Sequence, residues 1–203
     1  KCKIYYEKVF ADCPINTIHD CSMGSGGNTF PLFELGFSVS GSDINDNMLS
    51  FAKERANNEN REMDIFLADF LPLEQYIKNP YDCIISSGNS VPHVTNKGFS
   101  QLCKAVSNCL RPKGYFYFDM RNWDKIILNK QRYFPHSLEI TSDGYQNYLQ
   151  VWDYNHDGSI SVVMVFLTYN QNGKFLHEEI QTVPLYYPLL KSDMDSIMNA
   201  AGF

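Results

Sequence analysis

Along the first 120 residues, two patterns of apolar and polar positions follow one another regularly. Short apolar runs of strand length are separated by longer segments in which apolar residues recur every three or four positions, the spacing of an amphipathic helix. The pattern predicts strands at 16–21, 37–43, 63–68, 81–87 and 115–120, and helices at 1–10, 30–35, 46–57 and 100–110. Strands that alternate with helices indicate an α/β fold with a Rossmann-like, doubly wound and mostly parallel sheet.

The pattern changes after residue 120, where longer strand-like runs are separated only by turn signals. Strands joined by such short turns must be antiparallel. The sequence predicts three of them, at 147–155, 159–170 and 174–187, before a last helix at 189–201. We therefore expect an antiparallel β-meander inserted after the fifth strand: a Rossmann-like domain at 1–127 and 188–203, and a substrate-side subdomain at 136–187.

Composition narrows the class of protein. The chain has 203 residues, of which 44% are hydrophobic and 20% charged, an ordinary globular mixture. The net charge of -6 argues against a nucleic-acid partner, and no apolar run is long enough to span a membrane. Six cysteines without a C-x-x-C pair or a Cys/His metal spacing indicate a reducing, cytoplasmic location and no metal site. Because the sequence starts with Lys1 and ends abruptly, we expect a longer protein; its oligomeric state stays open.

The first strand leads into a glycine-rich loop. Asp20 ends the strand, glycines follow at 24, 26 and 27, and Asn28 or Thr29 is expected to cap the next helix. Glycine allows the backbone to turn sharply and to approach a ligand closely. A dinucleotide fingerprint, G-x-G-x-x-G, would need a third glycine where Thr29 stands, so a nicotinamide oxidoreductase is the weaker interpretation.

The other strands also end in polar residues. Ligands of an open parallel sheet bind beyond the carboxyl ends of its strands. Asp43 ends the second strand, where a carboxylate can accept both ribose hydroxyls of an adenosyl group or, alternatively, cap a helix. After the third strand, Asp69 can accept from an adenine amino group with Phe70 against the ring, or act as an ordinary turn residue. The fourth strand ends in the polar segment 86–93.

These segments resemble class I S-adenosylmethionine (SAM) methyltransferases, and among them the glycine and glycine/sarcosine N-methyltransferases. The resemblance lies in the acid-x-x-x-G-x-G loop, in Gly88-Asn89-Ser90 with His93, and in Arg121-Asn122-Trp123-Asp124 after the fifth strand. It implies SAM as cofactor and S-adenosylhomocysteine as product. It also implies a cofactor site at Asp20, Cys21, Gly24, Gly26, Asp43, Ile44, Met48, Asp69, Phe70, Ser87 and His93.

The resemblance also implies an acceptor site. Asn89 would orient an amine, Arg121 would hold a carboxylate through paired N–H donors, and Tyr169 and Tyr187 would supply hydroxyls around the transferring methyl group. For each there is a structural alternative: Arg121 can pair with neighbouring acids, and strand tyrosines commonly serve packing. No catalytic metal is required.

We therefore expect a SAM-dependent N-methyltransferase whose substrate is a small molecule with an amine and a carboxylate, such as glycine or sarcosine. Fold and cofactor do not fix the acceptor, so a methyltransferase of the same fold acting on another small molecule is the main alternative. A protein that senses SAM or acts as a scaffold without catalysis is a third.

Overall fold

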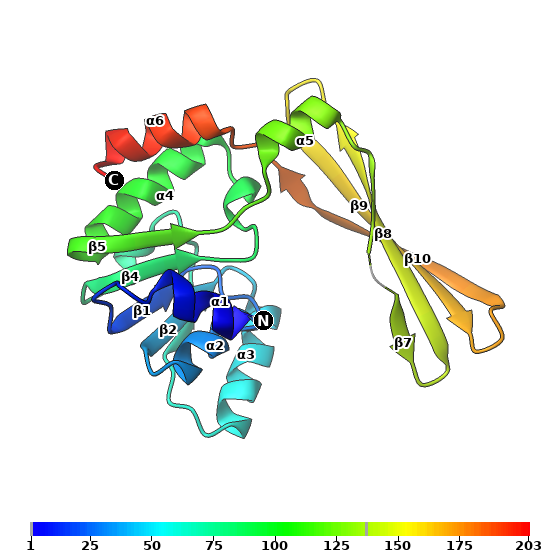
Figure 1. Cartoon of the computed structure of the whole chain (residues 1–203), viewed down its shortest axis with the longest axis horizontal. Helices are drawn as coiled ribbons and strands as arrows, with labels where there is room; N and C mark the ends of the chain where they lie inside the picture. Colours follow the sequence, from blue (N-terminus) through cyan, green and yellow to red (C-terminus); the bar gives the residue numbers. More distant parts are fainter. Residues whose placement is uncertain (1, 137) are drawn as a thin grey trace. The chain divides into compact units, whose positions relative to one another are not determined.

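The computed structural model describes residues 2–136 and 138–203 (Figure 1). The described chain forms two compact units. The first, here called the parallel-sheet unit, comprises Lys1–Val91, Asn96–Arg121 and Asp193–Phe203. The second, the antiparallel-sheet unit, comprises Pro92–Thr95 and Asn122–Ser192.

The parallel-sheet unit confirms the predicted fold class. Its five strands pair in the order β3-β2-β1-β4-β5, and every pair is parallel. The chain reverses direction across the sheet between β1 and β4, and ligands of open α/β sheets bind at such a switch point. The strands are β1 (Thr17–Asp20), β2 (Ser38–Asp43), β3 (Ile65–Leu67), β4 (Tyr81–Ser86) and β5 (Leu110–Phe118).

Helices connect these strands as the apolar spacing predicts. α3 buries Leu49, Ala52 and Ala56, whereas Met48, which the same spacing places on this face, is 38% exposed. Asn45 caps the helix by accepting from the Met48 N–H. One boundary was wrong: α4 begins at Asn96, before the expected start at 100, because its first turn already buries Gly98. The helices are α1 (Cys2–Val9), α2 (Phe30–Glu34), α3 (Asp46–Asn58), α4 (Asn96–Cys109) and α6 (Lys191–Ala201), with a 3₁₀ turn, η1, at Leu73–Gln75.

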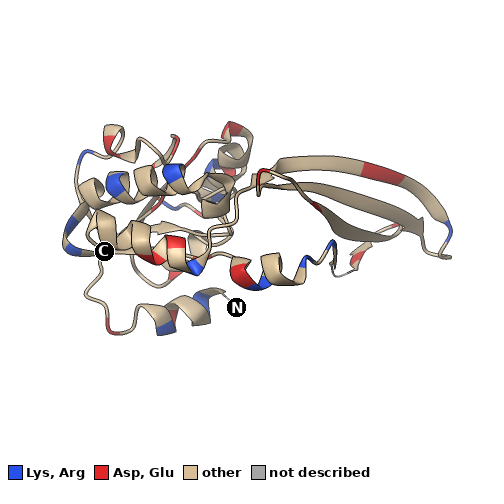
Figure 2. Cartoon of the chain, turned by 90° about the horizontal axis from the view of Figure 1, so that it is seen from above, with Lys and Arg blue, Asp and Glu red and all other residues tan. Residues whose placement is uncertain are grey.

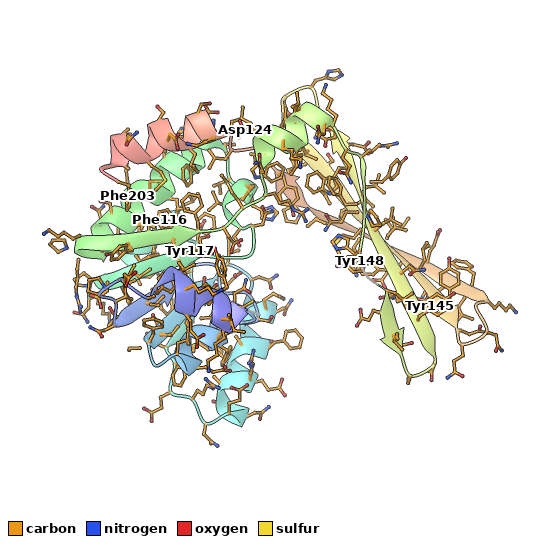
Figure 3. All side chains as sticks on the ribbon, viewed as in Figure 1. Phe116, Tyr117, Asp124, Tyr145, Tyr148 and Phe203 are labelled. Atoms are coloured by element: carbon orange, nitrogen blue, oxygen red, sulfur yellow. The ribbon has the colours of Figure 1, made fainter. Side chains whose placement is uncertain are left out.

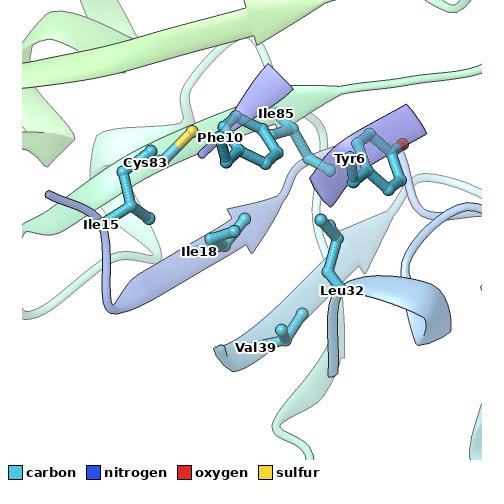
Figure 4. Close-up of a cluster of buried hydrophobic side chains, with 8 residues drawn as sticks. All are labelled: Tyr6, Phe10, Ile15, Ile18, Leu32, Val39, Cys83 and Ile85. Atoms are coloured by element: carbon cyan, nitrogen blue, oxygen red, sulfur yellow. The ribbon is translucent and has the colours of Figure 1, made fainter. Parts of the chain in front are cut away.

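A buried cluster fixes α1 and α2 against one face of this sheet (Figure 4). Cys83 belongs to it as a small apolar residue, which is how reduced cysteine behaves in a core. Its members are Tyr6, Phe10, Ile15, Ile18, Leu32, Val39, Cys83 and Ile85. The first strand and the helices that flank the glycine loop are therefore held by one continuous core.

β5 begins at Leu110, before the expected start at 115, and its pairing is interrupted over residues 111–114. Pairing with β4 shifts between Leu110, opposite Tyr81, and Tyr115, opposite Cys83. Lys113 has a φ of 66°, in the left-handed region. Further along β5, Phe116 packs against Phe203 near the end of the chain, with ring centroids 5.8 Å apart (Figure 3).

The antiparallel-sheet unit contains the three predicted long strands and more. Glycines at 158 and 173, both with positive φ, make the two predicted turns. The prediction lacked two short strands that pair with β8, and it lacked α5, which Asn122 caps by accepting from the Lys125 N–H. The elements are α5 (Trp123–Asn129), β6 (Tyr133–Pro135), β7 (Glu139–Thr141), β8 (Gly144–Tyr154), β9 (Ile160–Asn170) and β10 (Phe175–Tyr186), with the 3₁₀ turn η2 at Val91–His93 at its edge.

An aromatic core holds α5 to this sheet. Trp123 of α5 stacks on Trp152 of β8 at 5.8 Å, and Phe134 of β6 lies 4.2 Å from the same indole. Tyr186, at the end of β10, contacts both tryptophans. The Arg-Asn-Trp-Asp segment therefore starts a structural helix of this unit. The domain limits expected from the sequence stay a prediction.

The described charges are dispersed. Figure 2 shows Lys and Arg among Asp and Glu on the helices and loops, whereas most of the long strands is uncharged. Within the described residues, no helix has the length and apolar character needed to cross a membrane. The same residues contain no group of three or more His, Cys, Asp or Glu side chains suited to hold a metal ion.

Candidate active site

The glycine loop leaves β1 at the switch point of the sheet. Gly24 and Gly26 have φ values of 54° and 83°, which favour glycine. A Cβ on Gly26 would lie 2.4 Å from the Phe30 ring, so the helix start packs directly on the loop. The loop conformation therefore requires glycine at both positions, and at Gly26 the missing Cβ also leaves room for the Phe30 ring.

The Asp20 side chain fixes the glycine loop through hydrogen bonds. This side chain is fully buried, one oxygen accepts from the Ser22 N–H at 3.1 Å, and the other accepts from the Thr29 hydroxyl at 2.7 Å. Burial raises its pKa from 3.8 to about 7. We correct two expectations here: the Asp20 side chain is not open to a ligand and instead fixes the loop, and the Thr29 hydroxyl bonds to Asp20 without capping α2.

Cys21 is likewise buried. Its N–H donates to the Ile85 carbonyl at 2.9 Å, and burial raises the pKa of its thiol. The neighbouring Ser22 hydroxyl lies 3.0 Å from that of Ser86, at the end of β4. These contacts join the ends of β1 and β4, so Cys21 is a structural link and its thiol is not available to a ligand.

Asp43 joins the second strand to the loop. It is half-buried, and its two oxygens accept from the Gly24 N–H at 2.8 Å and the Asn45 N–H at 2.9 Å. A carboxylate has about four acceptor positions, so each oxygen retains one for a ligand hydroxyl. The geometry suits the predicted ribose contact and adds a role in shaping the loop.

Apolar side chains lie beside Asp43. Ile44 is 71% exposed and Met48 is 38% exposed, an unusual exposure for residues next to a polar loop. The Met48 methyl would lie 3.7 Å from a Cβ on Gly24. Both side chains are therefore available for a cofactor at the place where the sequence predicts them.

The end of β3 lies next to Asp43, because the Ala68 N–H donates to the Asp43 carbonyl at 3.0 Å. Asp69 and Phe70 follow and are half-buried. One Asp69 oxygen accepts from the Leu71 N–H at 2.9 Å, the turn role considered as its alternative. The other oxygen has no such contact among the interactions of the described residues, so the adenine role stays a prediction.

Asp119, at the end of β5, was missed by the sequence analysis. Its carboxylate accepts from the Gly88 and Asn89 N–H groups at 3.0–3.2 Å. Both donors have positive φ, 79° for Gly88 and 64° for Asn89, a strained conformation for a residue with a Cβ. An acid at a strand end was the available signal, and Asp119 fixes the loop that follows Ser87.

Asn89 and Arg121 come together at the ends of β4 and β5. The Asn89 side-chain oxygen accepts from the main-chain N–H of Arg121 at 2.9 Å. Both residues are half-buried. The amide and the guanidinium that the sequence predicts for acceptor binding therefore start from adjacent backbone positions.

A cavity of about 220 Å³ opens between α1, the glycine loop and the end of β5. Tyr6 is buried beside it, and its hydroxyl hydrogen-bonds Ser87. Burial and the nearby Asp20 and Asp119 charges raise the Tyr6 pKa, so this hydroxyl stays neutral. The cavity is lined by Cys2, Tyr5, Tyr6, Asn28, Tyr117 and Asp119.

His93 and Tyr187 belong to the antiparallel-sheet unit and lie near each other there. His93 Nδ1 lies 3.2 Å from the Leu185 carbonyl, and its ring lies 4.7 Å from that of Tyr186. The Tyr187 N–H donates to the Pro92 carbonyl at 2.7 Å. Burial lowers the pKa of His93, which favours the neutral imidazole. Their predicted contacts with ligands stay predictions.

Tyr169 lies at the opposite end of the same sheet from Tyr187. It stacks on Tyr145 at 5.0 Å, next to the β9–β10 turn, whereas Tyr187 follows the far end of β10. Eleven steps of about 3.3 Å along β10 separate the two ends by roughly 35 Å. The expectation that both hydroxyls surround one methyl group is therefore wrong for a single chain.

Comparison with known proteins shows which domain and which fold this chain resembles. Residues 18–114 match the family profile described as a methyltransferase domain. The whole described chain has the fold of class I methyltransferases: the SAM-bound amino pentose methyltransferase CalS10 from Micromonospora echinaspora superposes with a TM-score of 0.83 at 15% identity, covering 99% of this chain and 81% of that one. Residues 18–114 are therefore similar to a methyltransferase domain, and the described chain has the fold of that structure.

The proteins that are similar in sequence have names that give a more specific activity. The chain is 32% identical over 111 residues to a glycine/sarcosine N-methyltransferase from Halorhodospira halochloris, covering 54% of this chain and 41% of that protein. It is 32% identical over 122 residues to the glycine N-methyltransferase of Oryctolagus cuniculus, covering 53% and 41%. The matched part thus amounts to less than half the length of these curated relatives.

Proposed function

We propose that the chain is a SAM-dependent N-methyltransferase that acts on glycine, sarcosine or a related small amine with a carboxylate. The observation that carries the substrate assignment is the placement of Asn89 and Arg121 at adjacent strand ends, where the Arg121 main-chain N–H donates to the Asn89 side chain. The similarity to glycine and glycine/sarcosine N-methyltransferases supports the same substrate class.

The residues present fit the cofactor. The glycine main chain, the two open acceptor positions of Asp43 and the exposed Ile44 and Met48 match the loop, ribose and apolar contacts of an adenosyl group. The cavity beside Tyr6 is lined by Asn28, which directly follows the glycine loop, and would offer room for the amino acid portion. When bound, SAM supplies a methyl group on a sulfonium, which needs no further activation.

The chain's own contribution is then mainly positioning. Arg121 would pair with the substrate carboxylate through two N–H donors, and Asn89 would orient the amine so that its lone pair faces the methyl group. Such alignment contributes roughly 7–11 kcal/mol to lowering a barrier between two reactants. A hydroxyl or water that accepts the amine proton completes the chemistry.

A methyl-transfer assay with labelled SAM tests the proposal. The panel contains glycine, sarcosine, the matched amines without a carboxylate (methylamine and dimethylamine) and an amino sugar. We expect transfer to glycine or sarcosine, and Arg121→Lys should raise their KM at least tenfold while SAM affinity stays unchanged, because lysine cannot form the paired contact. Preferred transfer to the amino sugar would contradict the carboxylate assignment and leave a methyltransferase for another small molecule.

A further inference from the structure

Another cavity lies at the amino ends of the parallel strands. Its volume is about 360 Å³, which is within the range of small-molecule sites. Asp64 directly precedes β3 and Tyr81 begins β4, whereas the glycine loop, Asp43 and Asp69 lie at or beyond the carboxyl ends of their strands. This cavity is therefore separate from the candidate active site. It is lined by Asp64, Phe66, Tyr76, Lys78, Asn79 and Tyr81, and by the aliphatic side chain of Ile77.

Aromatic rings form one wall of this cavity. Phe66 stacks on Tyr76 with ring centroids 6.4 Å apart, and on His19 of β1 with centroids 5.5 Å apart. The His19 ring in turn lies 5.3 Å from the Tyr81 ring. The chain between β3 and β4 forms the short turn η1 instead of a long helix, and the lining rings stay accessible. Tyr76 is 44% exposed, and Phe66 and Tyr81 are half-buried.

Hydrogen bonds fix this wall from the side of the sheet. His19 is fully buried, its Nδ1 lies 2.8 Å from the Ser40 hydroxyl, and its Nε2 lies 3.0 Å from the Ser42 hydroxyl. The Ser40 hydroxyl donates to the Tyr81 hydroxyl at 2.8 Å. Burial lowers the pKa of His19 to about 3, so its imidazole is neutral at neutral pH and does not repel a cation. The wall is thus ordered before a ligand binds, which lowers the entropy cost of binding.

The charges of the lining indicate the chemistry of the ligand. The face of an aromatic ring attracts a cation, and groups of such rings bind methylated ammonium ions. Asp64 adds a carboxylate beside the rings, whereas the Lys78 ammonium and the Asn79 amide can donate to an anion. Within the part of the chain that the structure describes, the Asp64 and Lys78 side chains make no hydrogen bond or ion pair. Both charges are therefore available to a ligand.

We propose that this cavity binds a small zwitterion that carries a methylated ammonium group and a carboxylate. The rings and Asp64 would receive the ammonium group, and Lys78 with Asn79 would receive the carboxylate. The lining residues indicate this class whether or not the chain transfers methyl groups. An N-methylated amino acid, the product of the proposed reaction, belongs to the same class and would also fit this second site.

An NMR titration of the 203-residue chain tests the proposal, because amide shifts report the location of binding as well as its strength. Glycine betaine should shift residues 64–81 saturably, with a dissociation constant of about 1 mM. The isostere 3,3-dimethylbutanoate, which lacks the positive charge, and choline, which lacks the carboxylate, should each bind at least about fivefold more weakly. Equal binding of either analogue would overturn the proposal. Saturable shifts confined to residues 20–48, or no saturable shift up to about 100 mM, would also overturn it.

Two pairs of matched variants assign the binding to the lining residues. Asp64→Asn removes the charge and Tyr76→Leu removes a ring at an exposed position, and each should weaken glycine betaine at least about fivefold. Glu62→Gln, at a nearby exposed acid outside the cavity, and Tyr76→Phe, which keeps the ring, are the controls and should bind as the wild type does. Equal affinities within either pair would overturn the proposal. The titration needs no methyl transfer, so its outcome is independent of the proposed function.

Discussion

Replacing Asp43 separates its role toward a ligand from its role in the loop. Asp43→Asn keeps one acceptor oxygen for the Gly24 or Asn45 N–H but loses the charge, whereas Asp43→Ala loses both contacts. A hydrogen bond to a charged group contributes about 1.5–3 kcal/mol, so two ribose contacts amount to roughly 3–6 kcal/mol before water competes for the site. Because Asp43 is only half-buried, we expect a net loss of at least about 1.4 kcal/mol, a tenfold lower SAM affinity.

Isothermal titration calorimetry with SAM and S-adenosylhomocysteine measures this loss. Asp43→Ala should bind more weakly than Asp43→Asn, because the released Gly24 N–H no longer fixes the loop. Asp46→Ala, an acid in the first turn of α3, is the matched control and should bind as the wild type does. Thermal melts establish that each variant is folded. Wild-type affinity in folded Asp43→Asn and Asp43→Ala would refute the ribose assignment.

Two further predictions concern the loop. Gly26→Ala should lower the free energy of unfolding by roughly 1–2 kcal/mol and abolish tight SAM binding, because Gly26 has a φ of 83° and a Cβ there would meet Phe30. Gly27→Ala is the control and should bind SAM normally, because a Cβ on Gly27 would have nothing within 4 Å. Equal melting temperatures and affinities for both variants would contradict this. The pKa of Asp20 is raised to about 7, so the folded state favours the protonated acid. The stability that this protonation contributes is fully present below about pH 4 and is lost as the pH rises toward 7. In thermal melts, Asp20→Asn should therefore lose less stability than the wild type between pH 5 and 8; parallel pH profiles would refute the buried assignment.

Long periodic elements of this chain were predictable, and short ones were not. The spacing of Leu49, Ala52 and Ala56 gives α3 its buried face, and β8 and β9 are strand-like runs of eleven residues each between turn signals. β6 and β7 have three residues each, too few for a period to register. α5 carried a usable signal, since Asn122 before Trp123 with Asp124 in the first turn is an N-cap pattern.

The candidate site was predictable in position but not in the role of each acid. The sequence places Asp20, Asp43 and Asp69 at strand ends, but it does not reveal that Thr29, nine residues further on, donates to Asp20. Burial decides that role, and burial depends on packing. The misplacement of Tyr169 was avoidable: a turn at 171–173 already puts residues 169 and 187 at opposite ends of a hairpin.

Three acids at strand ends of the parallel-sheet unit, Asp20, Asp43 and Asp119, share one task beyond any contact with a ligand. Two of them accept backbone N–H groups from a neighbouring loop: Asp43 from Gly24 of the β1 loop, and Asp119 from the loop after β4. Asp20 instead accepts from a side chain, the Thr29 hydroxyl at the start of α2. The loops at three strand ends are thus fixed by the protein itself, so a ligand that binds there has less chain to order. Methyl transfer depends on alignment more than on a strong base. The proposed reaction therefore most requires from the fold that these acids hold the loops in place through hydrogen bonds.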